Sequence, residues 1–301
     1  MQSLIHAFSA DADFQTVATG IKSGMKEQLI SGLAGSSRQI LIASLLKELN
    51  RSVLVVTHNM FSAQKISEDL VECLSPDQVL LFPSNELIAA EAAVSSPEML
   101  AQRIEALLRL SSGFHGVIIA PYSGIRKLLP VKEIFRESHF EISVGESIEI
   151  EAFIQRLIVM GYERVERVEK KGEMSVRGGI IDFYPLTSEQ AYRIEWYDVE
   201  IDSIRSFDIA DQRSVEKLRT IDISPCRDII ADGKRFQNAA QHAFELLEAQ
   251  LGKMTDRHAK EKLKEEIGYD IEQLRQEQYF PSLYKYISLL YPERHTLFDY
   301  M

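Results

Sequence analysis

A glycine-rich stretch near the N-terminus has residue types that bind phosphate. Residues 32–39 read GLAGSSRQ; they follow the short segment QLIS (28–31) and precede apolar residues at helical spacing. Strand, loop and helix in this order form phosphate-binding loops, because backbone N–H groups and a helix N-terminus stabilise the anion. The stretch therefore predicts a strand at 28–31 and a phosphate-loop setting.

The residues on which nucleotide chemistry depends are replaced in this loop. Gly32 holds the first position of the pattern G-x-x-x-x-G-K-[ST], and Gly35 adds a second glycine. Ser37 stands for the second Gly of the pattern, Arg38 for the Lys and Gln39 for the Ser/Thr. Gln39 has no hydroxyl for magnesium, and Ser37 adds a Cβ where the backbone must approach phosphate. We expect a loop that keeps its fold without a nucleotide, no cofactor and no catalytic residue.

Basic side chains also gather in residues 161–185, GYERVERVEKKGEMSVRGGIIDFYP. They are Arg164, Arg167, Lys170, Lys171 and Arg177. Arginine fits planar carboxylates and stacks on aromatic rings, so an arginine-rich sheet face is suited to protein contact. The alternative is an ordinary solvated strand face. Two extended segments, 162–168 and 174–184, flank Lys171 and Gly172 and predict a β-hairpin that turns there.

Composition excludes several classes of protein. The net charge of −11 argues against a broad nucleic-acid footprint. Cys73 and Cys226 lie far apart, and the seven histidines form no ligand-spaced pair, so we predict neither a disulfide framework nor a metal site. No apolar run approaches the length of a membrane span, and we expect a cytoplasmic protein with no membrane contact.

Strands alternate with helices over the first 127 residues, which predicts an α/β body with a parallel sheet. The predicted strands are 52–57, 79–83 and 116–120, and the predicted helices are 11–26, 40–49, 61–71 and 97–110.

From residue 128 to 208 the pattern is mostly strand, interrupted by one helix at 151–160, and predicts an inserted α+β domain. Its other strands are 140–144, 192–197 and 201–207. A strand at 218–223 and charged helices beyond residue 225 follow. We expect residues 209–301 to pack with residues 1–127 as one α/β body.

With these elements placed, the chain resembles the bacterial transcription-repair coupling factor family (Mfd) and, more distantly, the excision-repair helicase subunit family UvrB. The similar segments are THNMFSAQ (57–64), GYER (161–164), VRGGIIDFYP (176–185), RIEWYDVEIDSIRSFD (193–208), YFPSLYKYIS (279–288) and TLFDY (296–300). The stretch GLAGSSRQ looks like the UvrB nucleotide loop with its working residues replaced. The acidic ATPase motif of that family would lie beyond Met301, so we expect a piece of a longer protein.

The resemblance implies a fold and a set of alternatives. It implies a parallel-sheet body like a degenerate P-loop helicase domain, with the inserted α+β domain at 128–208. The UvrB family carries a Tyr-rich hairpin that grips DNA, whereas residues 82–94 here, FPSNELIAAEAAV, contain no Tyr. This loss and the altered loop favour a non-catalytic module that recruits the damage-recognition ATPase UvrA to stalled transcription complexes. The alternatives are a UvrB-type ATP-dependent helicase subunit and a nucleic-acid binding module.

The resemblance also implies which residues bind a partner. UvrA would dock on the inserted domain through Arg164, Arg167, Arg177, Phe183 and Tyr184. RNA polymerase and DNA would be bound by the remainder of a longer protein, whose full-length relative is an ATP-dependent DNA translocase.

Strand alternation limits that set of residues. Tyr184 is favoured over Phe183 at the surface because its hydroxyl tolerates a polar rim. The competing interpretation of Arg177 is an internal ion pair with Asp182 or Glu173.

Overall fold

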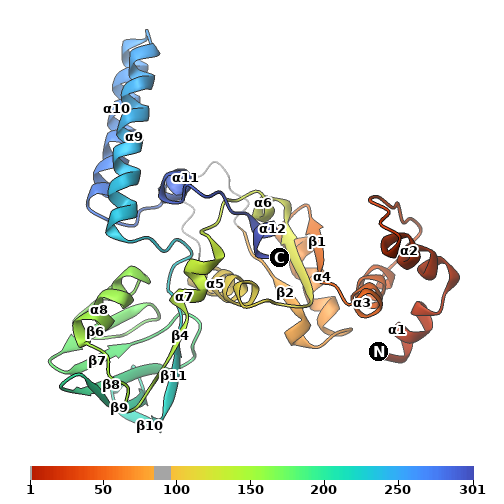
Figure 1. Ribbon diagram of the computed structural model, residues 1–301, viewed down its shortest axis with the longest axis horizontal. Coiled ribbons are helices and arrows are strands. Elements are labelled where there is room, and N and C mark those ends of the chain that lie inside the picture. The colour runs from red at the N-terminus through yellow and green to blue at the C-terminus, as the bar shows by residue number, and fades with distance from the viewer. Residues whose placement is uncertain (1, 85–95) are drawn as a thin grey trace. The chain divides into compact units, whose positions relative to one another are not determined.

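The computed structural model describes residues 2–84 and 96–301, and the contacts divide the chain into two compact units (Figure 1). Unit 1 comprises residues 1–88, 112–127 and 300–301, and unit 2 comprises residues 89–111 and 128–299. Residues 209–299 are thus grouped with 128–208, whereas the sequence predicted that they pack with the first 127 residues. The physical reason is that residues 229–291 form a core of their own, against which Leu128 and Ile134 pack.

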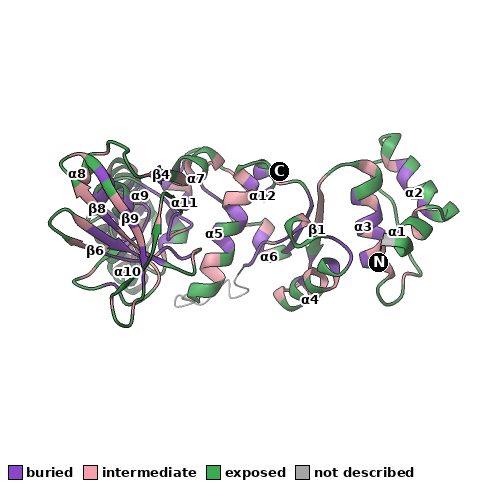
Figure 2. Ribbon diagram, turned by 90° about the horizontal axis from the view of Figure 1, so that it is seen from below, coloured by how far each residue is buried: buried purple, intermediate pink, exposed green. Residues whose placement is uncertain are grey.

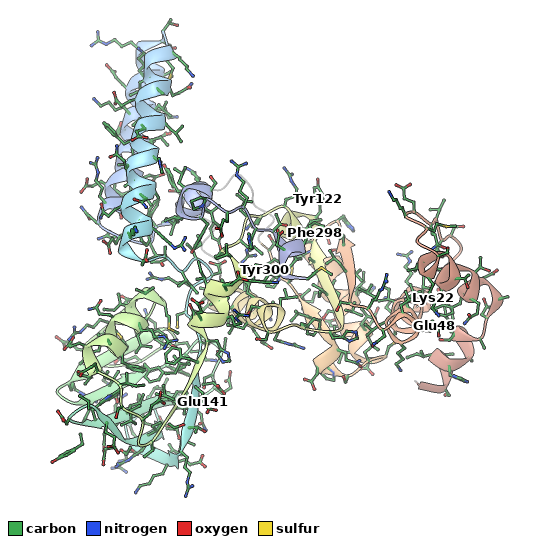
Figure 3. The ribbon with its side chains drawn as sticks, in the orientation of Figure 1. Lys22, Glu48, Tyr122, Glu141, Phe298 and Tyr300 are labelled. Atoms are coloured by element: carbon green, nitrogen blue, oxygen red, sulfur yellow. The ribbon has the colours of Figure 1, made fainter. Side chains whose placement is uncertain are left out.

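Unit 1 begins with helices and contains a small sheet. Its elements are α1 (Gln2–Ser9), α2 (Ala12–Lys22), α3 (Ser37–Leu49), β1 (Val53–Thr57), α4 (Met60–Val71), the 3-10 helix η1 (Pro76–Gln78), β2 (Val79–Leu81), β3 (Val117–Pro121) and α6 (Tyr122–Ile125). Lys22 of α2 and Glu48 of α3 form an ion pair of 2.5 Å (Figure 3).

The sheet of unit 1 has three parallel strands in the order β1-β3-β2, which confirms the predicted parallel α/β sheet. Val117 of β3 aligns with Val53 of β1 on one side and with Val79 of β2 on the other. The central strand β3 is buried along its whole length, as expected for an apolar strand in a parallel sheet.

The strand predicted at 28–31 is wrong. Residues 25–34 form neither helix nor strand, and Leu29 is 97% exposed. A short apolar run becomes a strand only where a neighbouring strand pairs with it, and here β1, β3 and β2 pair among themselves. The loop at 32–39 therefore precedes helix α3 without a strand before it.

Unit 2 holds most of the strands and the two longest helices. Its elements are α5 (Pro97–Ser111), α7 (Lys132–Ser138), β4 (Phe140–Ser143), α8 (Ile150–Val159), β5 (Glu163–Arg164), β6 (Glu173–Arg177), β7 (Ile180–Phe183), β8 (Ala191–Tyr197), β9 (Glu200–Phe207), β10 (Ser214–Leu218), β11 (Thr220–Ile223), α9 (Gly233–Lys253), α10 (Arg257–Arg275), the 3-10 helix η2 (Leu283–Tyr286) and α11 (Ile287–Leu290). The short helix α12 (Leu297–Tyr300) follows. In Figure 2 the buried residues of α5 appear as purple bands along the helix.

A six-stranded sheet with the order β10-β9-β8-β7-β6-β5 dominates the strand-rich part of unit 2. Helix α8 packs on one face, where Phe153 contacts Phe183 and Trp196 edge-on or at a tilt. A separate ribbon pairs β4 with β11, and Glu141 of β4 lies opposite Asp222 (Figure 3). These contacts place one apolar face of the large sheet in a continuous core.

The predicted hairpin turn at Lys171 and Gly172 is also wrong. Strand β5 pairs in parallel with β6, and the antiparallel hairpin is formed by β6 and β7. Its turn lies at Gly178 and Gly179, where Gly178 has φ +62°, a conformation that glycine adopts without strain. The connection before β6 is instead held by the carboxylate of Glu173, which accepts hydrogen bonds from two backbone N–H groups at residues 169 and 170.

The charged region beyond residue 225 forms a helical hairpin of α9 and α10, which the pattern predicted as helical (Figure 1). Asp232 and Asp256 cap the two helices by accepting hydrogen bonds from backbone N–H groups of the first turn. Asp270 is buried at the base and accepts hydrogen bonds from Ser282 and Tyr286. This hairpin therefore has a core and caps of its own.

Candidate protein-binding face

The large sheet of unit 2 has one apolar face and one charged face. Side chains alternate along a strand, so the residues between the core positions of β6 to β9 point away from helix α8. We call this second surface the arginine face. The charged residues that we assign to it are Arg177, Asp182, Arg193, Glu195, Arg205 and, from the adjoining strand β10, Lys217. Glu173 of β6 has the same alternation, but its carboxylate binds the backbone N–H groups of residues 169 and 170, and we do not count it.

Asp182 is the centre of the arginine face. Its side chain is only 1% exposed. Arg193 donates two hydrogen bonds to the two carboxylate oxygens, at 2.7 and 2.8 Å, and Arg177 donates a third at 2.5 Å. The hydrogen bond to Asp182 raises the pKa of the Arg193 guanidinium. One buried carboxylate thus holds two arginines in fixed positions.

Glu195 forms a second polar cluster beside the first. Ser203 donates a hydrogen bond of 2.9 Å to Glu195 Oε2, and Arg205 donates one of 3.3 Å to the same oxygen. The register aligns Arg193 with Asp182 on one side and with Arg205 on the other. The two clusters are therefore neighbours on one sheet surface.

The arginine face carries four basic and two acidic side chains, in a chain whose net charge is −11. The Arg177 side chain is 51% exposed, and Asp182 already accepts two hydrogen bonds from Arg193. Arginine binds carboxylates through a planar fork of donors, and a guanidinium held in place loses less entropy on binding. The arrangement can hold a carboxylate of a partner protein.

Arg164 and Arg177 do not project from the same face. Arg164 of the edge strand β5 aligns with Met174, whose side chain belongs to the core face. Arg177 lies three residues further along β6 and therefore points to the other face. Arg164 is exposed, so both arginines reach the surface from opposite sides of the sheet edge.

Arg167 lies outside the strands and binds a neighbouring turn. Its Nη2 donates hydrogen bonds to the carbonyl oxygens of Ile209 and Ala210, at 3.3 and 3.0 Å. Gln212 ties the same turn to Val168 by a hydrogen bond of 3.2 Å. The predicted binding residue Arg167 therefore has a structural role in holding the turn between β9 and β10.

Phe183, which the sequence placed among the binding residues, is buried, whereas Tyr184 reaches the surface in part. Phe183 is fully buried and packs against Phe153, Tyr162 and Tyr192 in the core, so its ring is not available to a partner. Tyr184 is half-buried, and its hydroxyl donates a hydrogen bond of 3.3 Å to the carbonyl of Glu189. The apolar alternation along β7 assigns Phe183 to the core face.

Four residues of the arginine face were missed by the sequence reasoning. They are Lys217 of β10 and, in β8 and β9, Arg193, Glu195 and Arg205. For the last three, the signal was present in the segment RIEWYDVEIDSIRSF, where charged residues alternate with Ile194 and Ile204. Period-two alternation assigns the charges to one face, although it does not say which strands pair.

In the loop at 32–39, Ser37 is hydrogen-bonded within the loop itself. Gly32 and Gly35 adopt positive φ angles, of +82° and +56°. Ser37, inside the first turn of α3, donates from its backbone N–H and its hydroxyl to the carbonyl of Ala34, at 3.2 and 2.7 Å. Arg38 is exposed. The backbone N–H of Ser37 is thus already engaged.

Gln39 links two helices of unit 1. It is buried in α3, and its Nε2 donates a hydrogen bond of 2.8 Å to Asp69 of α4. A carboxylate therefore accepts a hydrogen bond from the residue that stands where a phosphate loop has its magnesium-binding hydroxyl.

Among residues 2–84 and 96–301, no group of three His, Cys, Asp or Glu side chains could hold a metal ion. In the same residues, no helix is long and apolar enough to cross a membrane.

Comparison with known proteins matches part of the chain to one family and most of the chain to named relatives. Residues 140–228 match the family model of the UvrB interaction domain. The chain is 42% identical over 288 residues to the transcription-repair-coupling factor of Bacillus subtilis, a match that covers 96% of this chain and 24% of the relative. It is 32% identical to the proteins of that name from Staphylococcus epidermidis and Staphylococcus aureus, over 285 and 279 residues, with 92% of the chain and 24% of each relative covered.

The chain thus spans about a quarter of the length of the curated relatives it matches. The resemblance inferred from sequence to transcription-repair coupling factors and UvrB is confirmed. The absence of a Tyr-rich hairpin, inferred from residues 82–94, concerns a segment that lies mostly outside the described residues.

Proposed function

We propose that this chain is a non-catalytic interaction module that recruits UvrA for transcription-coupled nucleotide excision repair. The observation that carries the proposal is the position of the arginine face, because all six of its charged residues lie within the segment 140–228 that matches the UvrB interaction domain. A domain shared by UvrB and coupling factors supports a shared partner, and UvrA is that partner.

Binding is centred on Arg177 in this proposal. Its guanidinium is half exposed at the end of β6, and Asp182 fixes its position from below. A carboxylate of UvrA that reaches Arg177 replaces water around its guanidinium. Because Asp182 already holds this guanidinium in place, little side-chain entropy is lost on binding, which favours the interface. Arg164, on the other side of the sheet edge, is a second contact point.

Replacing Arg177 by alanine is expected to weaken the affinity for UvrA by about 2 kcal/mol or more, roughly thirtyfold. Folding should change little, because exposed ion pairs contribute only about 0–1 kcal/mol and Asp182 keeps its bonds to Arg193. Isothermal titration calorimetry with UvrA measures the affinity, and urea unfolding measures the stability.

Arg213→Ala is the matched control, since Arg213 is an exposed arginine in the turn after β9 and outside the arginine face. It should bind UvrA like the unmodified chain. Unchanged affinity in both Arg177→Ala and Arg164→Ala would remove these residues from the interface, and loss of folding in Arg177→Ala would assign it to the internal ion pair alone.

In this proposal, the chain neither binds ATP tightly nor hydrolyses it. The proposal is supported by the contacts of Ser37 and Gln39: the backbone N–H of Ser37 donates to Ala34, and the side-chain amide of Gln39 donates to Asp69 of α4. Titration with Mg-ATP should give no heat of binding at concentrations up to about 1 mM, a range that covers typical KM values of enzymes. A tight site that disappears in Arg38→Ala would overturn this part of the proposal.

The remaining contacts of the repair pathway lie, in this proposal, in the part of a longer protein that this chain does not include. The relatives are about four times as long as the aligned segment. RNA polymerase and DNA would be bound there, while this chain supplies the docking surface for UvrA.

A further inference from the structure

We infer that the arginine face has a second contact point, a pocket beside Tyr184 and Phe207 that receives a large apolar side chain of the same partner. The inference rests on the proposed function, because it concerns the protein that docks on Arg177. On the arginine face, recognition would then need two groups of the partner, a carboxylate at Arg177 and an apolar side chain at the pocket.

The pocket lies on the arginine face at the other end of the strands. It is lined by Tyr184, by the apolar residues Ala191, Phe207, Ile209 and Val215, and by the polar residues Glu189, Gln190, Ser206 and Asp208. Ala191 and Phe207 are buried at its base, in a small apolar cluster. Its volume of about 230 Å³ accommodates an amino-acid side chain.

Val215 makes this pocket unusual for a sheet edge. The register of β10 shifts between Ser214 and Glu216, so Val215 is the extra residue of a β-bulge. Its side chain is 70% exposed. A β-bulge turns a side chain away from the regular alternation of the strand. Here it leaves the aliphatic side chain of Val215 at the rim of the pocket, in contact with water.

Three of the polar residues around the pocket have partners within the chain, which favours an apolar occupant. Glu189 forms an ion pair of 2.8 Å with Lys171, and the carboxylate of Asp208 accepts a hydrogen bond of 2.7 Å from the backbone N–H of Ala210. Tyr184 donates its hydroxyl to the carbonyl of Glu189. A charged side chain would compete with these bonds, whereas an apolar one would remove the exposed side chain of Val215 from water.

The register gives the spacing of the two contact points. Arg177 of β6 aligns with Ile180 of β7, and Tyr184 follows Ile180 by four residues along the chain. At about 3.4 Å per residue, the pocket is roughly 14 Å from the Arg177 position along the strands. An extended segment of the partner with an acidic residue and a large apolar residue four positions apart fits both points.

Val215→Asp tests the pocket without touching Arg177. UvrA affinity of the whole chain should fall at least about tenfold, because a carboxylate at the rim of an apolar contact must be desolvated. Val144→Asp is the control, since Val144 is an exposed valine in the turn after β4. Val215→Ala, which removes apolar area without adding charge, should give a smaller loss of affinity.

The outcomes separate this inference from the proposed function. Absence of UvrA binding by the unmodified chain would remove the proposed function itself. Binding that is weakened by Arg177→Ala but equal for Val215→Asp, Val144→Asp and the unmodified chain would overturn only the pocket. The fluorescence of Trp196 during urea unfolding establishes that each variant is folded, and if Val215→Asp is not, the same comparison is decided by Val215→Ala.

Discussion

Replacing Asp182 by alanine is expected to lower the free energy of unfolding by about 3–5 kcal/mol in the strand-rich part of unit 2, which we call the sheet domain. The carboxylate is almost fully buried and accepts three hydrogen bonds from two arginines. Removing it leaves the Arg193 guanidinium, itself largely buried, with no carboxylate at its two former bonding positions. An unpaired, largely buried guanidinium lowers the free energy of unfolding by far more than the intact ion pair raises it.

The measurement is urea unfolding followed by the fluorescence of Trp196, the single tryptophan of the chain. This indole lies in β8 and donates a hydrogen bond of 3.0 Å to the carbonyl of Ile148, so it reports on the sheet domain and not on unit 1. Asp202→Ala, an exposed aspartate of β9, should change the free energy by less than about 0.5 kcal/mol. Equal stability of Asp182→Ala and Asp202→Ala would show that the network does not hold the face together.

Phe183→Ala should also cost about 3–5 kcal/mol of unfolding free energy, through the lost apolar burial and the cavity that remains. The ring is fully enclosed and makes aromatic contacts with Phe153, Tyr162 and Tyr192, with centroids 5.7 to 6.2 Å apart. Because Phe183 lies on the core face, the affinity of the folded fraction for UvrA should stay unchanged.

Tyr197→Ala is the control for this variant, because Tyr197 is an exposed aromatic residue at the end of β8. Its unfolding transition should match that of the unmodified chain. If Phe183→Ala were as stable as Tyr197→Ala but no longer bound UvrA, Phe183 would be an interface residue. That result would contradict its assignment to the core.

The elements that sequence predicts well are those whose own residues decide their burial. The apolar run of β3 has no polar face, so a parallel strand covered on both sides is the structure that accommodates it. The helices α4 and α5 show apolar residues at helical spacing and lie where the spacing predicts them.

Elements whose existence depends on a distant partner are predicted less well. The run 28–31 contains Leu29 and Ile30, yet among residues 2–84 and 96–301 no strand pairs with it. Similarly, Gly172 and Gly178 both permit a turn, with φ angles of +89° and +62°, and only the pairing of β6 with β7 decides between them. Local chemistry offers both turns, and long-range pairing selects one.

The candidate site was predicted in part for the same reason. Arg177 stands out as an arginine beside a turn in an acidic chain, and alternation separates Phe183 from Tyr184. Arg193 and Arg205 become part of one surface only when β7, β8 and β9 are aligned. No spacing along the chain reveals that alignment.

Competitive binding to UvrA tests the central claim most directly. The affinity of the unmodified 301-residue chain for UvrA is measured by titration, and the complex is then challenged with UvrB. We predict a saturable complex that UvrB displaces and that Arg177→Ala weakens, because both proteins would use the UvrB interaction domain. The account would be contradicted by no binding, or by a complex that neither UvrB nor Arg177→Ala affects.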